Sequence, residues 1–200
     1  AVLADVVQVK AANDSELAKY KGQLRGKIVV MQPVRAVRML DGRIILRMGE
    51  DLGTQIAPLI GMGLFEREIL PRHKKFLDVT NAYNVPVMLH TCGCSSWSYE
   101  KYIEAGLRAV DTLQPEIHEM SPRYLKDHFG GRLVFHGSIS TRGAVTYGTP
   151  EEVENEVKET LEIMMPGGGY CLAPTHRLQD NTPLENALKM YEVAHKIGRY

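Results

Sequence analysis

Residues 85–113, VPVMLHTCGCSSWSYEKYIEAGLRAVDTL, predict a strand, a helix and a second strand in succession. Val85–Leu89 is an apolar run of strand length, Ser98–Ala105 suits a helix, and Ala109–Leu113 is a second strand-sized run. Gly106 stands where the helix should end. Two strands joined by a crossover helix pair in parallel, so this stretch predicts one unit of a parallel α/β fold.

The same alternation continues on both sides of this unit. Further strands are predicted at Ile44–Met48, Leu133–His136 and Tyr170–Pro174. Further helices are predicted through Phe65–Leu77 and from Ser121, Thr149 and Thr182 onward. Strands that alternate with helices indicate the α/β class, with parallel pairing and crossover helices. Five such units are visible from residue 41 on, whereas a closed (β/α) TIM-type barrel needs eight, so a barrel built from them would be incomplete.

Helix starts are marked by capping residues. Thr149, Pro150 and Glu152 have the spacing of a capping box with proline at the first helical position. Thr182 and Glu185 repeat this pattern around a second proline. Both sites therefore predict a side-chain cap on the helix that follows.

The first forty residues differ from the rest. Strands are predicted within residues 1–9 and 26–30, and a short helix between residues 13 and 20. The run at residues 16–29 is similar to a segment of certain zinc aminopeptidases near their protease-associated insert, and the alternative is an αβ appendage without a special function. We therefore expect two parts: an αβ appendage over residues 1–40 and a barrel portion over residues 41–200.

Composition excludes several classes of protein. Lys plus Arg and Asp plus Glu number 24 each, so no excess of positive charge is present to hold nucleic acid or an anionic membrane. The apolar runs have the length of strands, far short of a transmembrane helix. Three cysteines do not form a disulfide framework and favour a reducing, cytoplasmic location. Cys171, inside the last strand, is predicted to be a small buried hydrophobe.

Each predicted strand delivers polar or ionisable residues at its carboxyl end. These residues are Glu50-Asp51, His90-Thr91-Cys92, Gln114-Pro115-Glu116, His136-Gly137-Ser138 and Thr175-His176. In a parallel barrel the carboxyl ends of the strands line the active-site mouth. The pattern therefore predicts an enzyme that acts on a small-molecule substrate.

Eight short segments resemble those of the uroporphyrinogen decarboxylase superfamily. They are Glu50–Gln55, Leu70–Lys75, Met88–Gly93, Gln114-Pro115, Phe135–Ile139, Gly148–Glu152, Pro166–Tyr170 and Asn181–Asn186. The resemblance covers about residues 41–200 and implies the C-terminal part of a (β/α) barrel. The superfamily includes porphyrinogen decarboxylases and cobalamin-dependent methyltransferases, so the resemblance leaves the reaction open.

The pair His90-x-Cys92 points to one branch of the superfamily. Alternate residues of a strand share a face, so both side chains can converge on one ion. In the thiol methyltransferases a His-x-Cys at this place and a later Cys bind zinc, and the later Cys aligns with His176 here. The resemblance thus implies a zinc site of His90, Cys92 and His176 with a fourth position open, and a corrinoid methyl donor carried by a partner protein. The alternative is that His90 and Cys92 only pack and hydrogen-bond at the strand end.

A metal-free decarboxylase is the competing interpretation. In that branch the residue aligned with His176 is a His that contacts substrate, and Asp51 is a substrate-contacting carboxylate. We take Asp51, His136 and His176 as candidate catalytic residues, with a loop-capping Asp51 and a structurally satisfied His136 as alternatives. The candidate substrate-binding residues are Gln55, Gln114 and Glu116.

The barrel units that the sequence does not supply limit the activity that is expected of this chain. Residues 1–40 do not match the arginine-rich segment with which the decarboxylases grip the acidic porphyrinogen, so uroporphyrinogen decarboxylation by this chain alone is not expected. The chain is expected to be a truncated, rearranged or fused form of the barrel. An open parallel sheet has unpaired edges, which predicts self-association or a partner subunit. An inactive fragment that only binds such a partner is the third interpretation.

Overall fold

The computed structural model describes residues 6–8, 19, 28–30, 37–38 and 44–198. The chain divides into two compact units, Ala1–Arg47 and Met48–Tyr200. In the first unit β1 (Val6–Gln8) pairs in parallel with β2 (Ile28–Val30). The helix expected between residues 13 and 20 lies outside the described residues, apart from Lys19.

Two short strands end the first unit. The strand β3 (Val37–Arg38) pairs antiparallel with the start of β4 (Ile44–Gly49). The last residues of β4, Met48 and Gly49, belong to the second unit and lead directly into the strand-end loop that carries the first candidate site residues.

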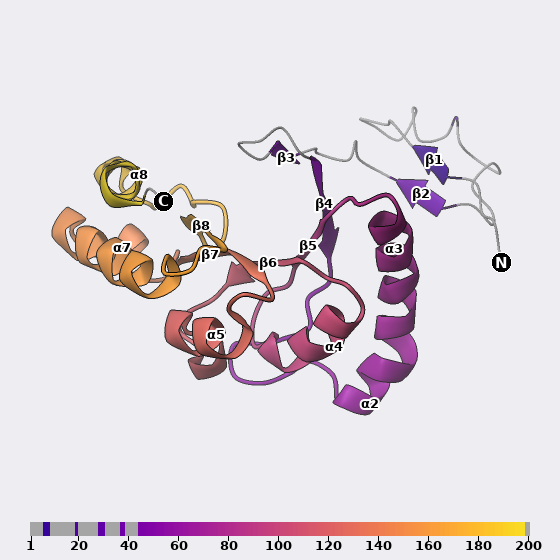
Figure 1. The fold of residues 1–200 in the computed structure, drawn as a ribbon. Helices are drawn as coiled ribbons and strands as arrows, with labels where there is room; N and C mark the ends of the chain where they lie inside the picture. The colour runs from indigo at the N-terminus through magenta and orange to yellow at the C-terminus, as the bar shows by residue number, and fades with distance from the viewer. Residues whose placement is uncertain (1–5, 9–18, 20–27, 31–36, 39–43, 199–200) are drawn as a thin grey trace. The chain divides into compact units, whose positions relative to one another are not determined.

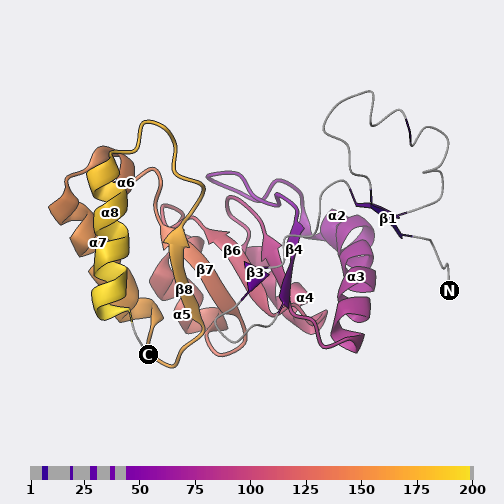
Figure 2. The same cartoon turned by 90° about the horizontal axis from the view of Figure 1, so that it is seen from above.

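The second unit is built on a sheet in which strand order follows chain order. From the end of β4 the order is β5 (Val87–His90), β6 (Ala109–Leu113), β7 (Val134–Ile139) and β8 (Tyr170–Pro174). The pairs β5–β6, β6–β7 and β7–β8 are parallel. All five strands predicted from residue 41 on are confirmed, and Figure 2 shows β6, β7 and β8 side by side.

Helical segments connect these strands. They are α2 (Met62–Leu64), the π-helix η1 (Phe65–Ile69), α3 (Leu70–Ala82), the 3₁₀ segments η2 (Ser96–Ser98) and η3 (His118–Met120), α4 (Tyr99–Glu104), α5 (Pro122–Phe129), α6 (Ala144–Tyr147), α7 (Pro150–Met164) and α8 (Leu184–Ile197). Figure 1 shows α4 and α5 on the same side of the sheet. No helix among the described residues is long and apolar enough to cross a membrane.

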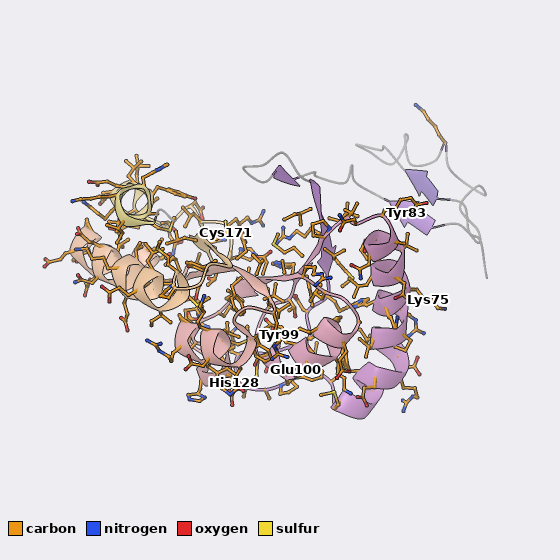
Figure 3. All side chains as sticks on the ribbon, viewed as in Figure 1. Lys75, Tyr83, Tyr99, Glu100, His128 and Cys171 are labelled. Atoms are coloured by element: carbon orange, nitrogen blue, oxygen red, sulfur yellow. The ribbon has the colours of Figure 1, made fainter. Side chains whose placement is uncertain are left out.

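The core lies between the sheet and this helix layer. Leu89, Val110, Phe135 and Tyr170 are register neighbours on consecutive strands, and all four are buried. Tyr99 of α4 is fully buried and packs edge-on against a phenylalanine of α5 with ring centroids 5.4 Å apart (Figure 3). Burying each large side chain of this kind contributes about 2 kcal/mol. Because side chains alternate along a strand, the next residue of each strand points to the opposite face.

The barrel is not closed. Among the described residues β8 has β7 as its only strand neighbour, so one edge of the parallel sheet is unpaired. The predicted architecture, an incomplete α/β sheet of the (β/α) barrel type, is confirmed.

The two predicted caps have different outcomes. The Thr149 hydroxyl accepts the Glu152 N–H at 3.3 Å, and the Glu152 carboxylate accepts the Thr149 N–H at 2.7 Å, so the first capping box is confirmed. The second is wrong, because α8 begins one residue later than predicted and its cap position is Pro183, without a side-chain cap. The Thr182 hydroxyl instead lies 3.2 Å from the hydroxyl of Thr146.

Cys171 is not buried as predicted. It is exposed on β8, the last strand of the sheet (Figure 3). Its register partner is His136, so it lies on the face opposite the helix-facing Tyr170. The prediction assumed a strand covered on both faces, and the open sheet leaves this face of β8 uncovered.

We expect Thr149→Ala to lower the free energy of unfolding by about 1 kcal/mol, because the Glu152 N–H loses its acceptor at the start of α7. Urea denaturation of the full chain measures the change. Thr149→Ser keeps the hydroxyl and serves as the control. Equal stability of the Ala and Ser variants would contradict the capping assignment.

Candidate metal and substrate site

Three potential metal ligands lie together where β4 and β5 end. One ligand atom each from Asp51, His90 and Cys92 lies within 4.8 Å of the others. Among the described residues this is the one group of three His, Cys, Asp or Glu side chains close enough to hold a single ion. His90 is the last residue of β5, whereas Asp51 and Cys92 each follow a strand end by two residues.

The two loops that carry these side chains are joined through their backbones. The Cys92 N–H donates to the Asp51 carboxylate at 3.0 Å, and the Cys94 N–H donates to the Thr54 carbonyl at 2.8 Å. Gly53 and Gly93 make the approach possible, since a Cβ on either would collide with the backbone of the other loop. The spacing of Asp51 and Cys92 is therefore set by main-chain packing.

His90 and Cys92 have the spacing of ligands to one ion. The Nε2 atom of His90 lies 3.7 Å from the Sγ atom of Cys92. Ligands of tetrahedral zinc, with bonds of about 2.0 Å to nitrogen and about 2.3 Å to sulfur, lie about 3.5 Å apart. A thiolate, an imidazole and a carboxylate are also the ligand types that zinc takes in proteins. The three residues therefore fit a zinc ion.

Asp111 lies behind this group and was not predicted as a site residue. Its side chain is 3% exposed and lies within hydrogen-bond distance of two histidine rings. One carboxylate oxygen lies 2.9 Å from Nδ1 of His90, and the other lies 3.2 Å from Nδ1 of His136. A charged residue inside the apolar run Ala109–Leu113 was the sequence signal that could have identified it.

The surroundings of Cys92 disfavour a bare thiolate. Burial raises the pKa of the Cys92 thiol, a hydrogen bond from the Thr112 hydroxyl partly offsets that rise, and the negative charges of Asp51 and Asp111 add to it. A bound cation would relieve both the desolvation and the repulsion.

Two predicted substrate-binding residues lie beside the group of Asp51, His90 and Cys92. The Gln114 side-chain oxygen accepts the Gly93 N–H at 2.6 Å and the Gln55 amide at 3.4 Å. The Gln55 oxygen in turn accepts a hydrogen bond from the Arg142 guanidinium at 2.9 Å. Arg142, which follows β7, was not predicted, because it stands three residues beyond the strand end. The Arg142 side chain places a positive charge next to Gln55, at the edge of the candidate site.

The other predicted residues lie outside the group of three potential ligands. Glu116 is exposed and accepts a hydrogen bond from the Ser140 hydroxyl. His176 is exposed in the loop after β8 and is not part of the group of three ligands. His136 lies in the middle of β7 rather than at its end, with its side chain 35% exposed.

Comparison with known proteins identifies a matching family. The sequence profile described as Uroporphyrinogen decarboxylase (URO-D) matches residues 51–197. This range includes every residue of the candidate site.

Individual relatives fall in two branches. The chain is 26% identical over 136 residues to a methylcobamide:CoM methyltransferase, MtbA, of Methanosarcina acetivorans, covering 68% of this chain and 38% of that protein. It is 25% identical over 135 residues to a uroporphyrinogen decarboxylase of Geobacter metallireducens, with the same coverage of 68% and 38%. The chain thus spans about two fifths of the length of these relatives.

A solved structure supports the fold. A methyltransferase from Methanosarcina mazei superposes with a TM-score of 0.61 at 21% identity, covering 78% of this chain and 42% of that one. At this identity the similarity concerns the fold alone.

We expect Gly93→Ala to destabilise the protein more than Gly131→Ala. Both glycines have positive φ, +74° and +79°, so both substitutions carry a backbone cost of about 1 kcal/mol. Only Gly93 faces another backbone, at Gly53 and Thr54, which adds about 1–3 kcal/mol of overpacking. Urea denaturation compares the two variants. Equal losses would contradict the close packing of the two loops.

Proposed function

The chain belongs to the uroporphyrinogen decarboxylase family, and we propose that within it the chain serves metal-assisted methyl transfer from a corrinoid donor to a thiol. The observation that carries this proposal is the group of Asp51, His90 and Cys92, whose ligand atoms lie within 4.8 Å of one another. The similarity to the methylcobamide:CoM methyltransferase favours the same branch.

The proposed ligand set differs from the one expected from the sequence. We propose Asp51, His90 and Cys92 as the zinc ligands, since the Cys92 N–H already binds the Asp51 carboxylate. His176 is the alternative third ligand, and movement of its exposed loop would be needed to bring it in. Three protein ligands leave a fourth tetrahedral position, at which zinc lowers the pKa of a bound thiol.

The methyl donor is proposed from the relatives. A methylcobamide, named as donor in the MtbA relative, would deliver the methyl group, carried by a partner protein. Gln55, Gln114 and Arg142 stand beside Cys92-Gly93, where they can hold polar groups of the thiol substrate.

Decarboxylation is the second candidate function. The similarity to the uroporphyrinogen decarboxylase of Geobacter metallireducens is nearly as high as that to MtbA, at 25% against 26%. In that case Asp51, His136 and His176 would contact a carboxylate substrate without a metal. Metal content separates the two candidates.

We also propose that a second copy of the chain covers one face of α8. Leu184, Leu188 and Tyr191 are exposed at helical spacing on that face, and β8 has an unpaired edge among the described residues. Large exposed apolar side chains in a row mark protein interfaces.

We expect the purified chain to bind about one equivalent of zinc, with binding lost in His90→Ala and Cys92→Ala and weakened in Asp51→Asn. Mass spectrometry of metal content and titration with Zn²⁺ measure this. Thiolate-to-metal absorption after Co²⁺ substitution reports whether Cys92 is a ligand, and Cys171→Ser is the matched control because Cys171 is an exposed thiol away from the group.

His176→Ala separates the two ligand sets. Unchanged affinity in this variant supports Asp51 as third ligand, and a loss as large as that of Cys92→Ala would assign the position to His176. Wild-type protein that binds no zinc would eliminate the methyltransferase proposal. Metal-loaded protein should then be assayed for demethylation of methylcobalamin by added thiols.

We expect the wild-type chain to form a dimer that Leu188→Asp converts to monomer, because a carboxylate in an apolar interface lacks a partner. Light scattering across a concentration series measures the mass against the 22.4 kDa chain. Glu185→Gln, in the first turn of the same helix, is the control. A wild-type monomer at every concentration would refute this interface.

A further inference from the structure

We infer that Asp111 is a positioning residue that holds both His90 and His136 in the tautomer with hydrogen on Nδ1, so that each ring presents a lone pair at Nε2. The consequence for metal binding rests on the proposed function. The tautomer assignment itself does not, because it follows from the hydrogen bonds of the metal-free chain.

The inference rests on which atom is the donor in each of the two hydrogen bonds to Asp111. The two oxygens of the Asp111 carboxylate each face a different ring nitrogen, Nδ1 of His90 and Nδ1 of His136. An ionised carboxylate only accepts hydrogen bonds, so both Nδ1 atoms must donate. A neutral imidazole has one donor and one acceptor nitrogen, which leaves Nε2 as the acceptor in both rings.

Strand register explains why one carboxylate reaches two rings. His90 and Asp111 are paired residues of β5 and β6. Val110 pairs with Phe135, which brings Asp111 beside His136 on β7. The three side chains thus form a row on the face of the sheet opposite Leu89, Val110 and Phe135, and the central one is almost fully buried.

For His90 the tautomer determines which nitrogen can bind a metal. Its Nε2 atom lies 3.7 Å from the Cys92 sulfur, on the side of the proposed zinc site. A ring held with hydrogen on Nε2 would first have to exchange that proton before it could coordinate.

For His136 the same tautomer creates a proton acceptor. Its side chain is 35% exposed, so a substrate can approach the ring. When a thiol binds there, its S–H bond breaks, the proton joins Nε2 of His136, and the resulting imidazolium is stabilised by the Asp111 carboxylate. Asp111 would therefore act on both the metal ligand and the proton acceptor without touching substrate.

The test is the tautomeric state of the two rings in the metal-free full chain. Long-range ¹H–¹⁵N correlation spectra of ¹⁵N-histidine-labelled protein distinguish the two tautomers above the ordinary histidine pKa of about 6.5. His90→Gln and His136→Gln assign the signals. We expect both rings to carry hydrogen on Nδ1, and hydrogen on Nε2 of either ring in the wild-type chain would overturn the inference.

Variants of Asp111 extend the test. Asp111→Asn offers one acceptor oxygen and one donor amide, so one ring should keep its tautomer and the other should switch to hydrogen on Nε2. Asp111→Ala should release both rings. Asp127→Asn, an exposed position on α5, should change neither ring.

Zinc affinity distinguishes a positioning role of Asp111 from a merely structural one, because a merely structural role would leave the affinity of the folded protein unchanged. Loss of the carboxylate should weaken zinc binding about 10–100-fold in folded Asp111→Ala, with one equivalent still bound at saturation. Unchanged affinity would refute the positioning role. A wild-type chain that binds no zinc would end the proposed function, and the tautomer spectra would still decide the inference about Asp111.

Discussion

The parallel register of β5 to β8 is the constraint on which both the core and the site depend. It aligns Leu89, Val110, Phe135 and Tyr170 in one buried row against the helices. The residues that follow them, His90, Asp111, His136 and Cys171, then form a second row on the opposite face, because side chains alternate along a strand. A slip of one residue in a strand would exchange the two rows. Apolar burial thus holds the polar row in place.

The carboxylates in and beside the polar row make the surroundings of Cys92 unfavourable for a further negative charge. Asp51 and Asp111 flank a thiol whose pKa is already raised by burial, so the group is poorly suited to an anionic thiolate on its own. Hydrogen bonds from the His90 ring and from the Cys92 backbone satisfy the two carboxylates but supply no full positive charge. A cation bound among these atoms would complete the electrostatics. Among the described residues, the Arg142 guanidinium is linked to the group through Gln55 and Gln114, whose side chains lie between it and the Gly93 N–H.

Local sequence patterns predicted most of the second unit. Apolar runs located all five strands, and the bounds of β6 and β8 agree with the prediction, because each is a short apolar run that begins within three residues of a glycine. The strand ends also identified Asp51, His90 and Cys92 as candidates. Asp111 and Arg142 were missed since one lies inside a strand and the other beyond its end. Tertiary contacts account for the two predictions that were wrong. The Thr182 hydroxyl forms a hydrogen bond with Thr146 instead of capping α8, and Cys171 is exposed on the strand at the open edge of the sheet.

The contact between Gly53 and Gly93 couples the loop that carries Asp51 to the loop that carries Cys92, so that the two move together. Their backbones touch without a side chain between them, so neither loop can swing outward independently to admit a substrate. Beside this group, Gln55 and Arg142 are exposed side chains joined by a hydrogen bond of 2.9 Å, and they can move without shifting either loop backbone. A single hydrogen bond joins these two exposed side chains. Rotamer changes can break it on the nanosecond timescale, so the pair can separate and close again without a backbone movement.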